Sequence, residues 1–182
     1  MDKNETAIGL VIKATSFAAD PHRNQRRKDV EASPYINHPI ALANVLANEG
    51  GVMDPAVLCG ALLHDTIEDT NTTAEELRAE FGEEITAMVL DVTDDKSIKD
   101  NARRKELQVQ HGPHILPKAK LVKLADKICN LRDIVAAPPS NSSRERKTEY
   151  FEWAARVIAG VRGTHSKLEA IFDEVLALQD TM

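Results

Sequence analysis

The hydrophobic positions of this chain follow a helical period almost throughout, and no convincing run alternates in the manner of a β-strand. The pattern predicts helices at about residues 5–19, 39–48, from 54 onward, 73–82, 83–92, 100–110, 117–134, 143–162 and 164–179. The polar stretch 20–37 predicts a long ordered loop. No internal repeat or second-domain boundary is visible, so we expect residues 1–182 to form one all-α domain.

Several helix ends are marked by residues with known local preferences. Gly50-Gly51 predicts a helix end, and Asp54-Pro55 combines a good N-cap with proline at the first helical position. Thr73 to Glu76 is a capping box that opens the next helix, which should end near Gly82. In the first helix one side carries Ile8, Val11, Ile12, Thr15 and Ala19.

The third helix changes character along its length. Its apolar stripe consists of Val57, Leu58, Ala61 and Leu62, and the same stripe continues into His64, Asp65, Glu68 and Asp69. Three carboxylates buried together are costly unless a cation or a change of protonation compensates. The helix therefore indicates a functional site more strongly than an end that merely emerges into solvent.

A second polar stripe lies on the helix predicted at 117–134. The core side contains Leu121, Leu124, Ile128 and Leu131, and the opposite side contains Lys123, Asp126, Asn130 and Asp133. Taken alone, this stripe is more typical of a solvent-facing surface. Together with His64 and Asp65 of the third helix and with His38, which precedes the second helix, however, Asp126 completes a set of four possible metal ligands.

These four residues make a mixed nitrogen and oxygen donor set for one divalent metal. Neutral imidazole with carboxylate favours Mn²⁺, Fe²⁺ or Zn²⁺ over Ca²⁺. The set contains no cysteine thiolate, so it does not resemble a structural zinc site. We expect Cys59 and Cys129 to be buried free thiols in a reducing, cytoplasmic environment, because both lie among apolar residues.

The charge distribution argues against some classes of partner. A formal net charge of −6 and a pI near 5.5 disfavour a protein that binds duplex nucleic acid, and no apolar run is long enough for a membrane span. Two local clusters are nevertheless basic: Arg23, Arg26, Arg27 and Lys28, and Arg103, Arg104 and Lys105. Each is either a solvated surface or part of a cup for a small anion such as a nucleotide polyphosphate.

The residues around the four candidate ligands resemble the HD superfamily of metal-dependent phosphohydrolases. Three segments carry the resemblance: Arg26 to Asp29 leading into Pro34-Tyr35-Ile36-Asn37-His38-Pro39, His64 to Thr70, and Val122 to Arg132. Together they are similar to the hydrolase domain of Rel/Spo homologues, which break down the alarmone (p)ppGpp. The segment Glu149 to Ala154 is similar to the free-standing small alarmone hydrolases. The resemblance covers about residues 5–180.

The resemblance implies an all-α HD-domain helical bundle with one Mn²⁺ and removal of pyrophosphate from the 3′ position of (p)ppGpp, which leaves GDP or GTP. By motif position, His38, His64, Asp65 and Asp126 would bind the metal, and Glu68 and Asp69 would be the acid/base pair. Substrate-binding residues would be Arg27, Lys28, Asn130 and Tyr150. No obligatory protein partner is evident. The basic motif reads Arg-Lys-Asp, where many long members have a small residue after the lysine.

Two other functions remain open from the sequence. A phosphatase with the same site could act on the 2′-phosphate of NADPH or on nucleoside monophosphates, releasing orthophosphate in place of pyrophosphate. A degenerate domain could bind a nucleotide without turnover, although such a domain normally lacks a ligand or a base that is present here.

Overall fold

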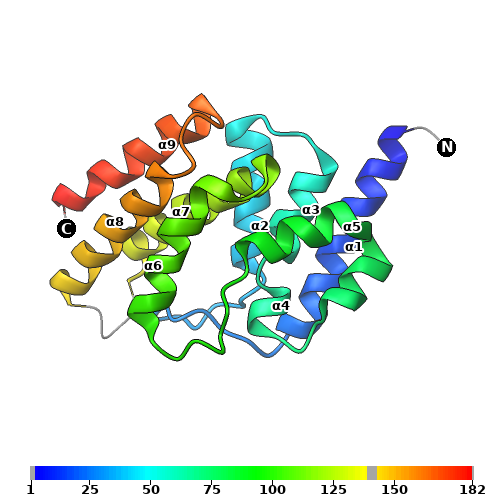
Figure 1. Cartoon of the computed structure of the whole chain (residues 1–182), viewed down its shortest axis with the longest axis horizontal. Helices are drawn as coiled ribbons and strands as arrows, with labels where there is room; N and C mark the ends of the chain where they lie inside the picture. Colours follow the sequence, from blue (N-terminus) through cyan, green and yellow to red (C-terminus); the bar gives the residue numbers. More distant parts are fainter. Residues whose placement is uncertain (1–2, 139–142, 182) are drawn as a thin grey trace.

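The computed structural model describes residues 3–138 and 143–181, and every regular element within them is a helix (Figure 1). The α-helices are α1 (Lys3–His22), α2 (Asn37–Asn44), α3 (Pro55–Leu63), α4 (Thr66–Asp69), α5 (Ala74–Val92), α6 (Asn101–His111), α7 (Pro117–Ala136), α8 (Arg144–Ala159) and α9 (Ser166–Leu176). A π-helix η1 (Val45–Gly50) extends α2, and short 3-10 helices η2 (Gly112–His114) and η3 (Ala177–Thr181) follow α6 and α9. The expected all-α fold is confirmed.

Two helices organise the packing. Helix α3 contacts α1, α2, α5 and α7, while α7 contacts α2, α3, α5, α8 and α9. Figure 1 shows α8 and α9 on one side of α7 and the α1–α5 layer on the other. The third helix and the helix of Asp126 are therefore the two central elements of the bundle.

The predicted caps are present. The Asp54 carboxylate accepts a hydrogen bond from the Ala56 amide at 2.9 Å, and Thr73 forms the full capping box with Glu76. Gly82 has φ 81° inside α5, so the helix predicted to end there does break. This conformation is readily adopted only by glycine, which explains why the sequence marks the break so clearly.

The apolar stripe predicts one helix that continues through Asp69, but the structure breaks it in two. Helix α3 ends at Leu63, and α4 begins only at Thr66. The Thr66 hydroxyl donates to the Leu63 carbonyl at 2.7 Å, a local bond that competes with helical continuation. His64 and Asp65 consequently lie in a bend between two helices.

The expected apolar side of the first helix is only partly buried. Ile8 and Ile12 are 62% and 63% exposed, because the face of α1 that packs against the bundle (Figure 1) carries Val11, Ala14 and Ala18 instead. Ala14 and Ala18 are fully buried, in a cluster formed by α1, α3 and α5.

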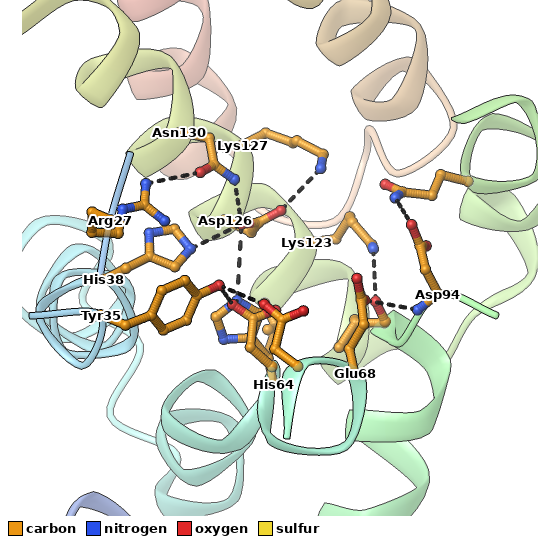
Figure 2. Close-up of a pocket in the computed structure, with 15 residues that line it drawn as sticks. Arg27, Tyr35, His38, His64, Glu68, Asp94, Lys123, Asp126, Lys127 and Asn130 are labelled. Carbon is orange, nitrogen blue, oxygen red and sulfur yellow. Dashed lines mark hydrogen bonds and ion pairs between the residues drawn. The ribbon is translucent and has the colours of Figure 1, made fainter. Parts of the chain in front are cut away.

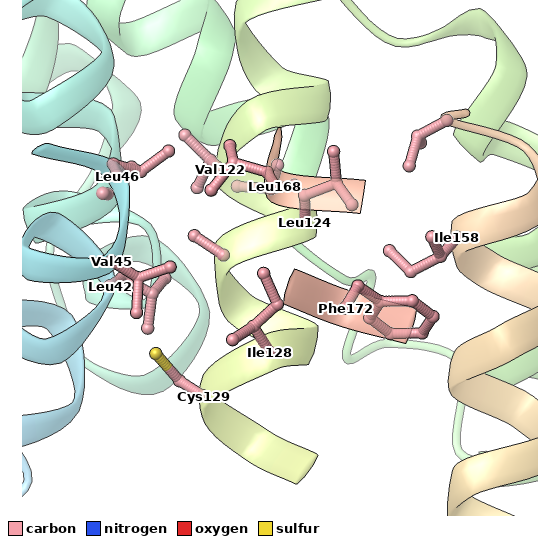
Figure 3. Packing of buried hydrophobic residues seen from close by; sticks show 14 of the residues in the cluster. Leu42, Val45, Leu46, Val122, Leu124, Ile128, Cys129, Ile158, Leu168 and Phe172 are labelled. Carbon is pink, nitrogen blue, oxygen red and sulfur yellow. The ribbon is translucent and has the colours of Figure 1, made fainter. Parts of the chain in front are cut away.

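A larger core lies around α7. Figure 3 shows Leu42, Val45 and Leu46 facing Val122 and Ile128, whereas Leu124, Ile158 and Phe172 lie on the other side of α7. Cys129 belongs to this core and Cys59 to the smaller one, and both thiols are free, as expected. Burial raises their pKa values to about 12 and about 11. Among the described helices, none has the length and apolar character needed to cross a membrane.

Candidate metal and catalytic site

The four predicted ligands converge on a cavity of about 170 Å³ (Figure 2). His38 is the second residue of α2, His64 and Asp65 occupy the bend between α3 and α4, and Asp126 lies in the middle of α7. Both histidines are buried. The bend that interrupts the third helix is thus what turns two neighbouring residues toward the same space.

The donor atoms are close enough to share one ion. One donor atom each from His38, His64 and Asp65 lies within 4.8 Å of the other two. His64 Nε2 is 3.0 Å from Asp65 Oδ2. Asp126 reaches this group through the imidazoles, with its Oδ1 atom 3.3 Å from His38 Nε2 and 3.9 Å from His64 Nε2.

Neighbouring groups fix the orientation of these side chains. The Ala61 carbonyl lies 2.8 Å from His64 Nδ1, an arrangement that leaves Nε2 directed into the cavity. The Tyr35 hydroxyl donates to Asp65 Oδ2 at 2.6 Å. Asp126 accepts from Asn130 Nδ2 at 2.6 Å and pairs with the Lys127 ammonium at 3.0 Å.

The charges of the site fit a divalent cation. Burial disfavours ionisation of Asp126, but the positive charge of Lys127 and a hydrogen bond from His38 hold its pKa well below the usual range. Burial also lowers the pKa of His64, yet the carboxylates of Asp65 and Asp126 raise it to about 9. Two ionised carboxylates therefore draw positive charge onto an imidazole, and a metal ion would replace that proton.

Glu68 and Asp69 differ sharply although they are adjacent. Burial raises the pKa of Glu68 to about 7, while its Oε2 atom accepts from the Asp94 amide at 2.9 Å. Asp69 is held by three donors: Gln25 Nε2 at 3.3 Å, the Tyr35 hydroxyl at 3.2 Å and the Lys96 ammonium. Glu68 is therefore the carboxylate better suited to exchange a proton near neutral pH.

A second cavity of about 570 Å³ borders the first and contains the predicted nucleotide-binding residues. Arg27, Lys28, Asn130 and Tyr150 all line it. Arg27 donates to Asn130 Oδ1 at 3.4 Å and pairs with Asp133 at 2.5 Å. Because the Asn130 amide also donates to Asp126, the two cavities are joined by hydrogen bonds.

Only one of the two basic clusters contributes to these cavities. Arg26, Arg27 and Lys28 line the larger one, whereas Arg103, Arg104 and Lys105 are not among the residues that line either. Arg104 bonds the Ile98 carbonyl, and Lys105 lies over the rings of Tyr150 and Trp153 at 5.8 and 5.1 Å.

Some residues of the site carried no role in the sequence analysis. Arg146 and Lys147 line the larger cavity, and their only sequence signal is their position one turn before Tyr150. Tyr35 belongs to the motif around His38, but its contact with Asp65 and Asp69 depends on tertiary structure.

Comparisons with known proteins agree with this geometry. The HD domain family model matches residues 14–156. Guanosine-3′,5′-bis(diphosphate) 3′-pyrophosphohydrolase MESH1 of Xenopus tropicalis is 52% identical over 166 residues, which are 91% of this chain and 92% of the relative. The Homo sapiens protein of the same name is 52% identical over 159 residues, 87% of this chain and 88% of the relative.

A solved structure shows the same fold. It is described as a metazoan orthologue of SpoT that hydrolyses ppGpp and plays a role in starvation responses. It matches with a TM-score of 0.90 and 39% identity, covering 95% of this chain and 97% of that structure. This chain therefore belongs to the HD domain family, within the group that contains MESH1.

Proposed function

We propose that this protein is a guanosine-3′,5′-bis(diphosphate) 3′-pyrophosphohydrolase, a metal-dependent enzyme that converts (p)ppGpp to GDP or GTP and pyrophosphate. The observation that carries the proposal is the continuity between the buried donor set and the basic cavity beside it. The first has the chemistry of phosphoryl hydrolysis and the second has the charge to hold a nucleotide. Relatives about half identical over most of the chain bear the name of this activity.

In this proposal His38, His64, Asp65 and Asp126 hold one divalent ion, with Mn²⁺ preferred and Fe²⁺ or Zn²⁺ as alternatives. When bound, the ion polarises a phosphoryl oxygen and acidifies water. Glu68 accepts the proton of the attacking water, for which its pKa of about 7 is well matched. Asp69, fixed by Gln25, Tyr35 and Lys96, supports the orientation of that water.

The remaining residues hold the nucleotide. Arg27 and Lys28 contact base and phosphates, Asn130 the ribose, and Tyr150 a phosphate or the sugar. The hydrogen bonds of Asn130 to both Arg27 and Asp126 support a position at the junction of nucleotide and metal. We also propose that residues 1–182 form a single domain, because α3 and α7 pack on helices from both halves of the chain. Two buried free thiols support a cytoplasmic location.

The test is an assay with added Mn²⁺ against ppGpp, NADPH and deoxynucleoside monophosphates, in which orthophosphate and pyrophosphate are measured separately. We expect GDP and pyrophosphate from ppGpp in equal amounts. Orthophosphate released from NADPH or a monophosphate with a higher kcat/KM would replace the proposal by a phosphatase. Nucleotide binding without any turnover would indicate a binding domain.

A further inference from the structure

Two lysines one helical turn apart on α7 line the smaller cavity and differ in their partners. Lys123 and Lys127 are both buried, with 7% and 3% of their surface exposed. Figure 2 shows the Lys127 ammonium group directed at Asp126 and the Lys123 ammonium group on the side of Glu68 and Asp94. The sequence places both near the predicted ligand, but it does not distinguish them.

Lys127 has both a counterion and an aromatic ring as partners. Its Nζ atom lies 3.0 Å from Asp126 Oδ2 and 4.3 Å from the centre of the Trp153 ring. Burial lowers its pKa, but the charge of Asp126 outweighs burial and raises the pKa above its usual value. The charge of Lys127 is thus compensated by Asp126 and by the Trp153 ring, both within the protein.

Lys123 has one hydrogen bond, to the Val92 carbonyl at 3.2 Å, and no ion pair within the described part of the chain. Val92 is the last residue of α5, so this bond caps a helix C-terminus. An ammonium carries three N–H groups, and helix capping uses one of them. Two donors therefore stay free beside the cavity.

The nearby carboxylates are engaged elsewhere. Glu68 accepts from the Asp94 amide, Asp94 accepts from Gln108, and Asp126 pairs with Lys127. Burial, with the charge of Lys127, lowers the pKa of Lys123. A buried ammonium group that has no ion-pair partner favours the arrival of an anion. The smaller cavity shares Arg27, Tyr35 and Asn130 with the basic cavity, so an anion held by the basic residues lies next to it.

We infer that Lys123 is a further substrate-binding residue, whose two free N–H groups donate to oxygens of the 3′-pyrophosphate group and retain pyrophosphate after cleavage. The inference rests on the proposed function. In that reaction a water oxygen bonds to the phosphorus attached to O3′, and the P–O3′ bond breaks. Glu68 takes one proton from the water and passes it to O3′, so that O3′ leaves as a hydroxyl group and Glu68 is ionised again. Both phosphates leave together, so Lys123 contacts the same group in substrate and product.

The experiment measures inhibition of ppGpp hydrolysis by inorganic pyrophosphate, with Mn²⁺ in excess over pyrophosphate and GDP as the measured product. We expect Lys123→Met to raise both the inhibition constant of pyrophosphate and the KM for ppGpp by about tenfold or more, because charge-assisted hydrogen bonds are lost. Lys123→Arg should recover part of the pyrophosphate inhibition. Lys118→Met is the matched control on the same helix, since Lys118 is partly exposed and pairs with Asp54 and Glu84.

A purely structural lysine gives a different result. If Lys123→Met lowers the melting temperature and kcat but leaves pyrophosphate inhibition as in the wild type, Lys123 only caps α5 and the inference is wrong. Should Lys123→Met fail to fold, Lys123→Gln provides the same comparison, because its amide can still donate to Val92. Failure of the proposed function is visible separately, since the wild type would then release no GDP and pyrophosphate from ppGpp.

Discussion

The metal side and the nucleotide side of this site are built in different ways. His38 lies in α2, His64 in the bend after α3 and Asp126 in α7. The two histidines are buried, and ion pairs join both of them to Asp126. Arg26 and Lys28 lie in the non-helical segment between α1 and α2 and line the larger cavity. The first region is preorganised for chemistry, whereas the second supplies charge that salt can screen. Changes in the two regions should therefore alter different kinetic constants.

The largest effect is expected for a lost ligand. Asp126→Asn or His64→Ala should lower metal affinity by at least about 100-fold and remove activity at limiting metal, because the remaining donors bind more weakly. Elemental analysis and turnover check both quantities, and circular dichroism should show the helices retained. Asp173→Asn, an exposed change on α9, is the control. Wild-type metal content in either variant would remove that residue from the site.

The next effect concerns Glu68, which belongs to the metal side but need not bind the ion. Glu68→Gln should keep the metal and the KM while lowering kcat by roughly 10²–10⁴, the usual contribution of a general base. Steady-state kinetics at saturating Mn²⁺ provide the measurement. A near-normal kcat would mean that Glu68 is structural and that Asp69 is sufficient.

On the nucleotide side a smaller and different effect is expected. Arg27→Ala combined with Lys28→Ala should raise the KM for ppGpp by about tenfold and change kcat less, because these charges bind ground state and transition state alike. The salt dependence of kcat/KM should also become less steep. Arg23→Ala is the control, since Arg23 is exposed and pairs with Asp20. An unchanged KM and salt dependence would make the cluster a solvated surface.

The smallest effect is a pH dependence of kcat that follows the ionisation of Glu68. Burial raises the pKa of Glu68 to about 7; Asp94 and Asp65 act in the same direction, while the Asp94 amide and Lys96 oppose them. Glu68 must be ionised to accept a proton, so kcat should fall as pH decreases through this value. A bound cation favours the carboxylate, so the fall from pH 7.5 to 6.5 should be at most about threefold. A kcat in Glu68→Gln that retains the wild-type acid limb would contradict this assignment.

Much of this site follows from the sequence because its members lie in short motifs. The order of His38, His64-Asp65 and Asp126 predicts the donor set, and the caps at Asp54 and Thr73 predict where helices begin. The sequence does not predict the break at His64, because a hydrophobic stripe reports which side of a helix is buried and not whether the backbone continues. Local hydrogen bonding by Thr66 contributes to that break.

Other features depend on contacts between distant segments. Arg146 lines the nucleotide cavity only because α8 packs beside α7. Lys123 and Lys127 differ in their partners only because Asp126 and Trp153 lie next to Lys127. The sequence also suggested that Ile8 and Ile12 share a face with Val11, but the position of α1 against α3 leaves both isoleucines exposed. Packing, rather than periodicity, determines these outcomes.

The central claim is that one divalent ion held by four side chains supports hydrolysis of the 3′-pyrophosphate of ppGpp. Its most direct test is to remove bound metal with a chelator and to titrate the protein with Mn²⁺ while GDP and pyrophosphate are measured. Activity should be absent after chelation and should reach its plateau at one equivalent of Mn²⁺ per chain. Full activity in the chelated protein, or a plateau that requires two equivalents, would contradict the claim.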